Sequence, residues 1–126
     1  MLVRGIRGAT TVESNTREEI LDAARELLEA IMQANDLPHD HVASIIFTTT
    51  PDLNAEFPAV AARELGWTDV ALECMHEMNV PGSLPKCLRI LMHVNTDRSA
   101  SEIKHQYLRG AVVLRRDIVE QQGATS

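Results

Sequence analysis

A single long helical pattern, set between short apolar runs, constrains the fold of this chain more than any other feature. Thr16 followed by Glu19 has the spacing of a capping box, which predicts that a helix begins there. The Leu37–Pro38 pair predicts that this helix ends near Asn35. The apolar residues between these ends recur on one helical face, and they are Ile20, Leu21, Ala24, Leu27, Leu28, Ile31 and Met32.

The other apolar residues fall in short runs that are typical of strands. These runs are 2–9, 44–50, 70–75, 87–94 and 111–115. Two shorter helices are expected between the later strands. One runs from Pro58 to Leu65, and the other begins at Ser99, which repeats the capping-box spacing with Glu102, and runs to about Leu108.

This alternation of strands and helices predicts one domain of the α/β or α+β class, with helices on one side of a five-stranded mixed sheet. The domain is expected to span residues 1–116, and 117–126 are expected to form a flexible tail because they lack apolar periodicity. With only two substantial helices, the apolar sheet is expected to leave one face for a partner chain.

Composition excludes several classes of function. The chain has 126 residues, a net charge of −6 and only 3% aromatic residues, which argues against nucleic-acid binding and against an anionic membrane surface. No apolar run reaches the roughly 18 residues that a membrane span needs. The N-terminal residues do not resemble a signal peptide, and two cysteines do not make a disulfide framework. We therefore expect a cytoplasmic protein.

The stretch 72–94 contains the residue types of a metal site, namely Cys74, His76, Cys87 and His93. Their spacings do not match the short repeated spacings of zinc ligands, and Arg89 between two candidate ligands would repel a cation. We expect no metal here. A nucleophilic cysteine with His76 as its base would lack an orienting third group, and no nucleotide-binding motif is present.

Two arginines lie in the middle of apolar strand patterns, where an unpaired charge is costly. Arg7 and Arg89 are each expected either to meet a buried glutamate or to line a pocket for a ligand with carboxylates. Glu13, Glu73 and Glu77 are available for the first arrangement. The residues alone leave both possibilities open.

Four stretches together resemble one family. RGIRGATTVE (4–13), TPDLNAEFPAVAARELG (50–66), CMHEMNVPGSLPKCLRI (74–90) and YLRGAVVLRRD (107–117) resemble the AroH class of chorismate mutases, in order from residue 3 to about 118. The resemblance implies a homotrimeric pseudo-α/β-barrel with active sites between adjacent subunits. It implies the Claisen rearrangement of chorismate to prephenate, toward phenylalanine and tyrosine, with neither cofactor nor metal.

The resemblance also implies roles for particular residues. Arg89 would stabilise the breaking ether oxygen, Arg7 and Tyr107 would hold a carboxylate, and Glu77 and Cys74 would contact the ring hydroxyl. The other substrate-binding positions that it implies are Phe57, Arg63, Glu73, Met75, His76, Leu114 and Arg115. Val60 replaces a lysine of some relatives, and Pro85 interrupts the loop before the fourth strand.

Two other functions are compatible with the residues. One is a trimeric module that binds small carboxylates without rearranging them. The other is a metalloprotein that uses Cys74, His76 and Cys87. Loss of chorismate would separate the enzyme from the binding module, and metal analysis would test the metalloprotein.

Overall fold

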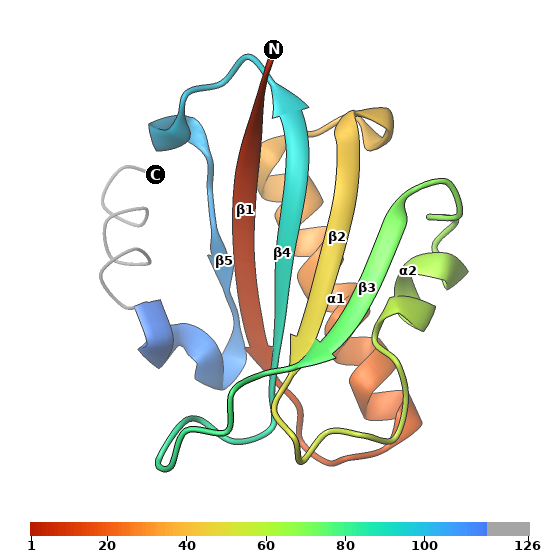
Figure 1. Cartoon of the computed structure of the whole chain (residues 1–126), viewed down its shortest axis with the longest axis vertical. Coiled ribbons are helices and arrows are strands. Elements are labelled where there is room, and N and C mark those ends of the chain that lie inside the picture. Colours follow the sequence, from red (N-terminus) through yellow and green to blue (C-terminus); the bar gives the residue numbers. More distant parts are fainter. Residues whose placement is uncertain (116–126) are drawn as a thin grey trace.

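A computed structural model describes residues 1–115, and it contains one five-stranded sheet with the strand order β3-β2-β4-β1-β5 (Figure 1). The strands are β1 (Leu2–Thr11), β2 (Val42–Thr49), β3 (Ala71–His76), β4 (Cys87–Thr96) and β5 (Gln106–Tyr107). The central strand β4 is antiparallel to β1 and β2, whereas the two edge strands pair in parallel, β3 with β2 and β5 with β1. The predicted mixed sheet is confirmed.

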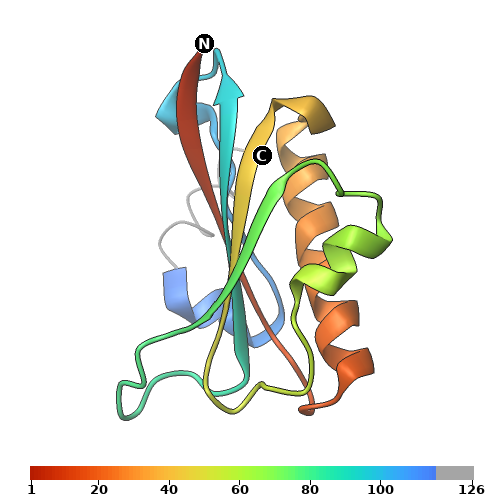
Figure 2. The same cartoon turned by 45° about the vertical axis from the view of Figure 1, so that its right-hand side comes forward.

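Two α-helices, α1 (Arg17–Asn35) and α2 (Ala59–Glu64), lie on the same face of the sheet (Figure 2). The hydroxyl of Thr16 accepts a hydrogen bond from the Glu19 N–H at 3.2 Å, as the capping pattern predicts. The helix ends at Asp36, whose backbone is left-handed. The predicted apolar stripe of α1 is almost wholly buried against the sheet.

The main core lies between these helices and one face of the sheet. Side chains such as Phe47 and Ile90 alternate into it from their strands, and they are fully buried. Gly8 allows the closest approach of α1, because a β-carbon there would lie 2.7 Å from Cδ1 of Ile31. No α-helix in the described part of the chain is long and apolar enough to cross a membrane.

The predictions for the end of the chain were wrong in two places. The expected helix 99–108 is only a one-turn 3₁₀ helix, η2 (Ala100–Glu102), followed by β5. The capping box at Ser99 does form, but it caps this single turn. The buried side chain of Asn35 then hydrogen bonds to both the N–H and the carbonyl of Lys104, at 2.8 and 2.9 Å. These two hydrogen bonds keep the backbone at Lys104 extended, so that β5, which follows, can pair with β1.

The expected strand 111–115 lies instead in a second 3₁₀ helix, η3 (Arg109–Arg115). Ala111 packs on the face of the sheet opposite α1 and forms a small second core with Ala9, Cys87 and Tyr107. The apolar residues of this segment therefore contact the sheet surface rather than extend the sheet. The expected tail, 117–126, lies outside the described residues.

Candidate active site

Strand register brings five side chains into one row across the sheet. Met75 of β3 pairs with Thr48 of β2, which pairs with Arg89 of β4. Arg89 also pairs with Ala9 of β1, which pairs with Tyr107 of β5. Paired residues on neighbouring strands point to the same side of a sheet, so this row lies on the face opposite α1.

An ion pair occupies the middle of this row. Glu77 follows β3 directly, and its N–H donates to the carbonyl of Thr49 at 2.9 Å. Nε of Arg89 lies 2.7 Å from Oε1 of Glu77, and the same oxygen accepts a hydrogen bond from the Thr48 hydroxyl at 2.8 Å. The Glu77 side chain is 16% exposed and that of Arg89 is 42% exposed. Arg89 therefore meets a glutamate, which is the first of the two arrangements that the sequence left open.

The Nε atom of Arg89 is nevertheless buried without a hydrogen bond to any residue in the described range. Its approach to Glu77 is close, but the N–H does not point at the carboxylate well enough for a hydrogen bond. A buried donor without an acceptor is costly in free energy. Because the Arg89 side chain as a whole is 42% exposed, the part of it that a ligand can reach lies elsewhere than at this atom.

A hollow of about 190 Å³ opens beside Arg89. We call it the arginine hollow, and it is lined by Arg7, Gly8, Thr48, Arg89, Ile90, Leu91 and Tyr107. The Arg7 side chain is exposed, and no carboxylate of residues 1–115 lies within ion-pair distance of it. Two guanidinium groups and a phenol at one hollow suit a carboxylate-bearing ligand.

Parallel pairing with β5 determines how Arg7 and Tyr107 sit. The backbone N–H of Arg7 donates to Nδ1 of His105 at 2.9 Å, and Tyr107 pairs with Ala9. Leu114 of η3 packs against the second core beside Tyr107. The side chain of Arg115, also a predicted site residue, lies outside the described part of the structure.

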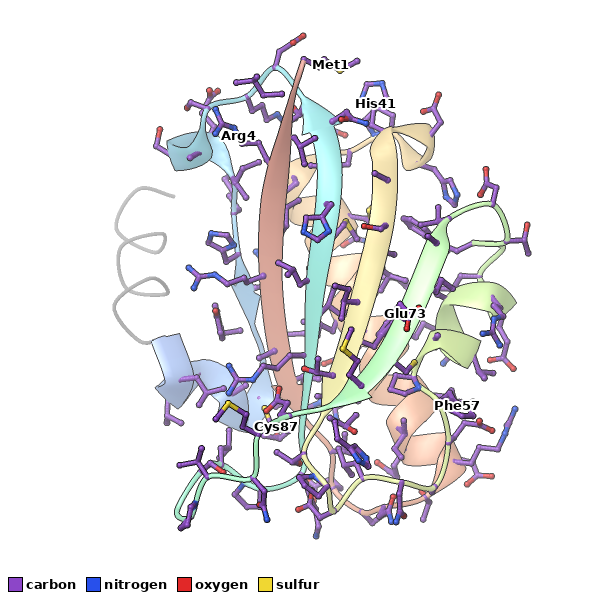
Figure 3. The ribbon with its side chains drawn as sticks, in the orientation of Figure 1. Met1, Arg4, His41, Phe57, Glu73 and Cys87 are labelled. Carbon is purple, nitrogen blue, oxygen red and sulfur yellow. The ribbon has the colours of Figure 1, made fainter. Side chains whose placement is uncertain are left out.

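Other predicted site residues lie around a different hollow. The edge hollow, about 300 Å³, is lined by Thr49, Leu53, Asn54, Ala55, Glu56, Phe57, Pro58, Cys74, Met75 and His76. Phe57 is 66% exposed and lies beside the outer edge of β3 (Figure 3). Arg63 of α2 and Glu73 of β3 are exposed and close enough to Cys74 to act on its thiol electrostatically.

The structure does not bring Cys74 and Glu77 together within one chain. Cys74 pairs with Phe47, a core residue, so its side chain points toward the helices rather than toward the row with Arg89. The predicted site residues thus lie mainly in two places. Arg7, Arg89 and Tyr107 line the arginine hollow, and the residues that line the edge hollow are Phe57, Cys74, Met75 and His76.

Both cysteines are free thiols with raised pKa values. Burial raises the pKa of Cys74, and it raises the pKa of Cys87 to about 11 even though Arg89 nearby acts in the opposite direction. Both groups are therefore neutral near pH 7. Within the described residues, no group of three or more His, Cys, Asp or Glu side chains could hold a metal ion.

A hydrogen-bonded link joins the loops that follow β2 and precede β4. The Thr50 hydroxyl donates to Asp52, whose other carboxylate oxygen accepts from the Lys86 N–H at 2.9 Å, and the Cys87 N–H donates to Thr50 at 3.0 Å. Burial opposes ionisation of Asp52, but these hydrogen bonds from Thr50 and Lys86 lower its pKa below the usual value. These hydrogen bonds hold the start of β4, two residues before Arg89, against the loop that follows β2.

Sequence reasoning missed Thr48 and Asp52. Alternation along β2 could have placed Thr48 on the face opposite Phe47, but only the register with β4 shows that it lies beside Arg89. Asp52 carried no local signal for its partner at Lys86, because these residues meet only through the fold.

Comparison with known proteins gives a consistent result. Residues 3–118 match the family model described as chorismate mutase type I. The chain is 50% identical to chorismate mutase AroH of Bacillus subtilis (strain 168) over 119 residues, which is 94% of each chain. It is 48% identical to chorismate mutase AroH of Thermus thermophilus over 122 residues, 96% of this chain and 100% of the relative.

A solved structure of a chorismate mutase from Clostridium thermocellum superposes on this fold with a TM-score of 0.86. The two are 55% identical, and the match covers 87% of this chain and 98% of the other. The fold, the near-complete coverage and the family match agree, so the chain belongs to the chorismate mutase type I family.

Proposed function

We propose that this chorismate mutase converts chorismate to prephenate at sites shared by adjacent copies of a homotrimer. One copy contributes the arginine hollow with Glu77, and its neighbour contributes the edge hollow with Cys74 and Phe57. The observation that carries the proposal is that two arginines, Arg7 and Arg89, line one hollow together with Tyr107. The exposed part of the Arg89 side chain would meet the ether oxygen of the substrate.

The division of the site residues supports a shared site. The arginine hollow, at about 190 Å³, is small and open to the surface of one chain. The edge hollow lies at the edge strand β3, and Cys74, one of its lining residues, points to the helical side of the sheet. A neighbouring copy that brings its β3 edge against the arginine hollow would enclose a ligand on both sides.

The uncovered face of the sheet supports assembly. Val3 is 62% exposed and Leu91 is 37% exposed on this face, where they would contact water in an isolated chain. Both α1 and α2 lie on the other face of the sheet (Figure 2). Apolar strand faces of this kind are normally buried by a second layer, and two further copies of the chain would supply it.

The proposed mechanism is conformational and electrostatic. Arg7 and Tyr107 hold a carboxylate of the substrate, which fixes the enolpyruvyl arm above the ring and lowers the entropic part of the barrier. Negative charge grows on the ether oxygen as its C–O bond breaks. Arg89 stabilises this charge more in the transition state than in the bound substrate, which accelerates the reaction.

Glu77 and Cys74 would act on the ring. The Glu77 carboxylate accepts a hydrogen bond from the ring hydroxyl and faces the partial positive charge that develops there. Cys74 of the neighbouring copy contacts the same hydroxyl as a neutral thiol, in accord with its raised pKa. Since the rearrangement is intramolecular, neither residue needs to transfer a proton.

We propose that the enzyme works in the cytoplasm. Its two cysteines, Cys74 and Cys87, are free thiols, a state that a reducing compartment maintains.

The decisive experiment is incubation of the purified protein with chorismate. Loss of the ultraviolet absorbance of chorismate together with formation of prephenate is the expected result. Binding of chorismate without turnover would instead establish a carboxylate-binding module, and it would refute the proposed reaction.

A further inference from the structure

We propose that Thr48 is a positioning residue that fixes the orientation of the Glu77 carboxylate beside Arg89, so that the two groups form a close ion pair but no two-point hydrogen-bonded pair. The proposal rests on the proposed function, because it assigns a task to a residue of that same site. Thr48 touches the chemistry only through Glu77, and it keeps the hydrogen-bond donors of Arg89 available for the substrate.

The first argument is the way Glu77 is anchored. Its backbone N–H donates to the carbonyl of Thr49 at 2.9 Å, and its Oε1 accepts from the Thr48 hydroxyl at 2.8 Å. Two consecutive residues of β2 therefore fix both the backbone and the side chain of Glu77. The Thr48 hydroxyl is the only hydrogen-bond donor to this carboxylate among the described residues.

The second argument is that Thr48 and Arg89 meet at one oxygen. Nε of Arg89 lies 2.7 Å from the same Oε1 but makes no hydrogen bond with it. A carboxylate and a guanidinium at this distance normally align in a two-point, charge-assisted pair. A carboxylate oxygen can accept two hydrogen bonds, so Thr48 does not displace Arg89, but its hydrogen bond fixes how the Glu77 carboxylate is turned relative to the guanidinium.

The third argument is the rigid placement of the threonine. Thr48 pairs directly with Arg89 in the register of β2 and β4, and it lines the arginine hollow. It sits in a strand within the sheet rather than in a loop, which keeps its hydroxyl at a defined place relative to both charges. Its single O–H proton is given to Glu77 and is not available as a donor to a ligand.

Removal of the hydroxyl has a specific consequence. In Thr48→Val the carboxylate is free to turn onto Arg89 and complete the two-point pair, which leaves fewer donors for the ether oxygen. Valine matches threonine in shape and suits a strand, so the sheet is retained. Thr48→Ser restores the hydroxyl with a smaller side chain.

The test compares kcat and KM of these variants with chorismate. Thr48→Val should lower kcat about 10- to 100-fold, as expected for loss of a hydrogen bond to a charged group, with a smaller change in KM. Thr48→Ser should stay within about threefold of the parent enzyme. The matched control is Thr10→Val on β1, a buried threonine whose only side-chain hydrogen bond in the described range is a 3.5 Å contact with the Thr11 carbonyl.

A double-mutant cycle shows whether Thr48 acts through Glu77. In a Glu77→Ala background, Thr48→Val should have no further effect on kcat. An undiminished effect in that background, an equal loss in Thr10→Val, or a loss in Thr48→Ser as large as that in Thr48→Val would each overturn the proposal.

A readout without turnover separates this inference from the function on which it rests. The NMR resonance of the Glu77 carboxyl carbon in the ligand-free protein should shift in Thr48→Val and return in Thr48→Ser. If the parent protein fails to rearrange chorismate, the proposed function is refuted, whereas this resonance still decides whether Thr48 holds Glu77. An unchanged resonance in Thr48→Val would refute the positioning role.

Discussion

Arg89 combines two properties that normally exclude each other, a close carboxylate partner and a buried donor without a hydrogen bond. A structural ion pair would be expected to satisfy the donor through the partner. The exposed part of the Arg89 side chain borders a hollow that Arg7 and Tyr107 also line. This arrangement supports our proposal that Arg89 is preorganised for a ligand.

Replacement of Arg89 tests this view. Arg89→Ala should lower kcat by at least about 10²–10³, the usual effect of removing one preorganised donor. Arg89→Lys should also be poor, because an ammonium group cannot reproduce the planar fork of donors. Arg25→Ala on α1, whose guanidinium pairs with Asp22 and Glu64, is the matched control and should leave kcat unchanged. Full activity in Arg89→Lys would contradict the role of the guanidinium.

The thiols lead to a prediction about pH. Burial raises the pKa of Cys87 to about 11 and also raises the pKa of Cys74, so both remain protonated through the neutral range. The proposed reaction also needs no proton transfer. A plot of kcat/KM between about pH 6 and 9 should therefore vary less than about threefold. A bell-shaped profile would instead indicate acid–base chemistry by a Cys–His pair.

At the scale of elements, the close packing of α1 on β1 depends on one glycine. A β-carbon at Gly8 would lie 2.7 Å from Cδ1 of Ile31 and 3.0 Å from Cδ1 of Leu27. Gly8→Ala should therefore destabilise the fold by about 1–3 kcal/mol, measured by denaturant unfolding. Gly5→Ala on the same strand is the control, since its β-carbon would lie an ordinary 3.7 Å from Leu91. Equal stability of the two variants would contradict this account.

The link between the loops at Asp52 predicts how stability depends on pH. The folded pKa of Asp52 is lower than its unfolded value of about 3.9, so its ionised form stabilises the folded state. This contribution is complete above the unfolded pKa and is lost as the pH falls through the folded pKa. The difference in unfolding free energy between the parent and Asp52→Asn should thus be greatest above about pH 5 and should shrink in more acidic solution.

Thr50→Val removes one of the donors to Asp52. It should therefore show part of the same pH-dependent difference in unfolding free energy from the parent. A difference that grows as the pH falls would contradict the assignment of Asp52.

The elements with strong local signals were predictable from the sequence. The capped stripe of α1 and the apolar runs of β1 to β4 each carry a periodicity that depends only on nearby residues. The end of the chain was mispredicted because its conformation depends on distant partners. Asn35 holds Lys104 extended, and the Ala9 carbonyl accepts a hydrogen bond from the Leu108 N–H at 2.9 Å. Neither contact leaves a trace in local periodicity.

For the site, the sequence indicated which residues to consider but not how they group. Mid-strand arginines such as Arg89 are conspicuous because charge is costly there. The family resemblance implied further roles, and these stay predictions. The division between the arginine hollow and the edge hollow depends on which face of β3 each side chain occupies. That follows from register, which no local pattern specifies.

At the scale of the whole molecule, shared sites predict that two impaired variants can restore each other. Arg89→Ala disables the arginine hollow, and Arg63→Ala removes the cation that acts on Cys74 of the edge hollow. When the two are co-expressed in equal amounts, random trimers should contain about a quarter of the parent's intact sites. About three quarters of the trimers are mixed, and each mixed trimer has one site in three with both halves intact.

The matched control combines Arg89→Ala with Glu77→Ala, two changes in the same half of the site. No arrangement of these chains gives an intact site, so no recovery of kcat is expected. Recovery in this control, or none in the first mixture, would contradict a site built from two copies.

The single row of paired residues from Met75 to Tyr107 makes turnover a measure of correct strand alignment. A slip of one residue in β4 would turn Arg89 into the core and would place Leu88 or Ile90 in the hollow. Such a misaligned chain would lose both its core packing and its cationic centre. Activity recovered after refolding should therefore count the chains whose five strands have found their native neighbours.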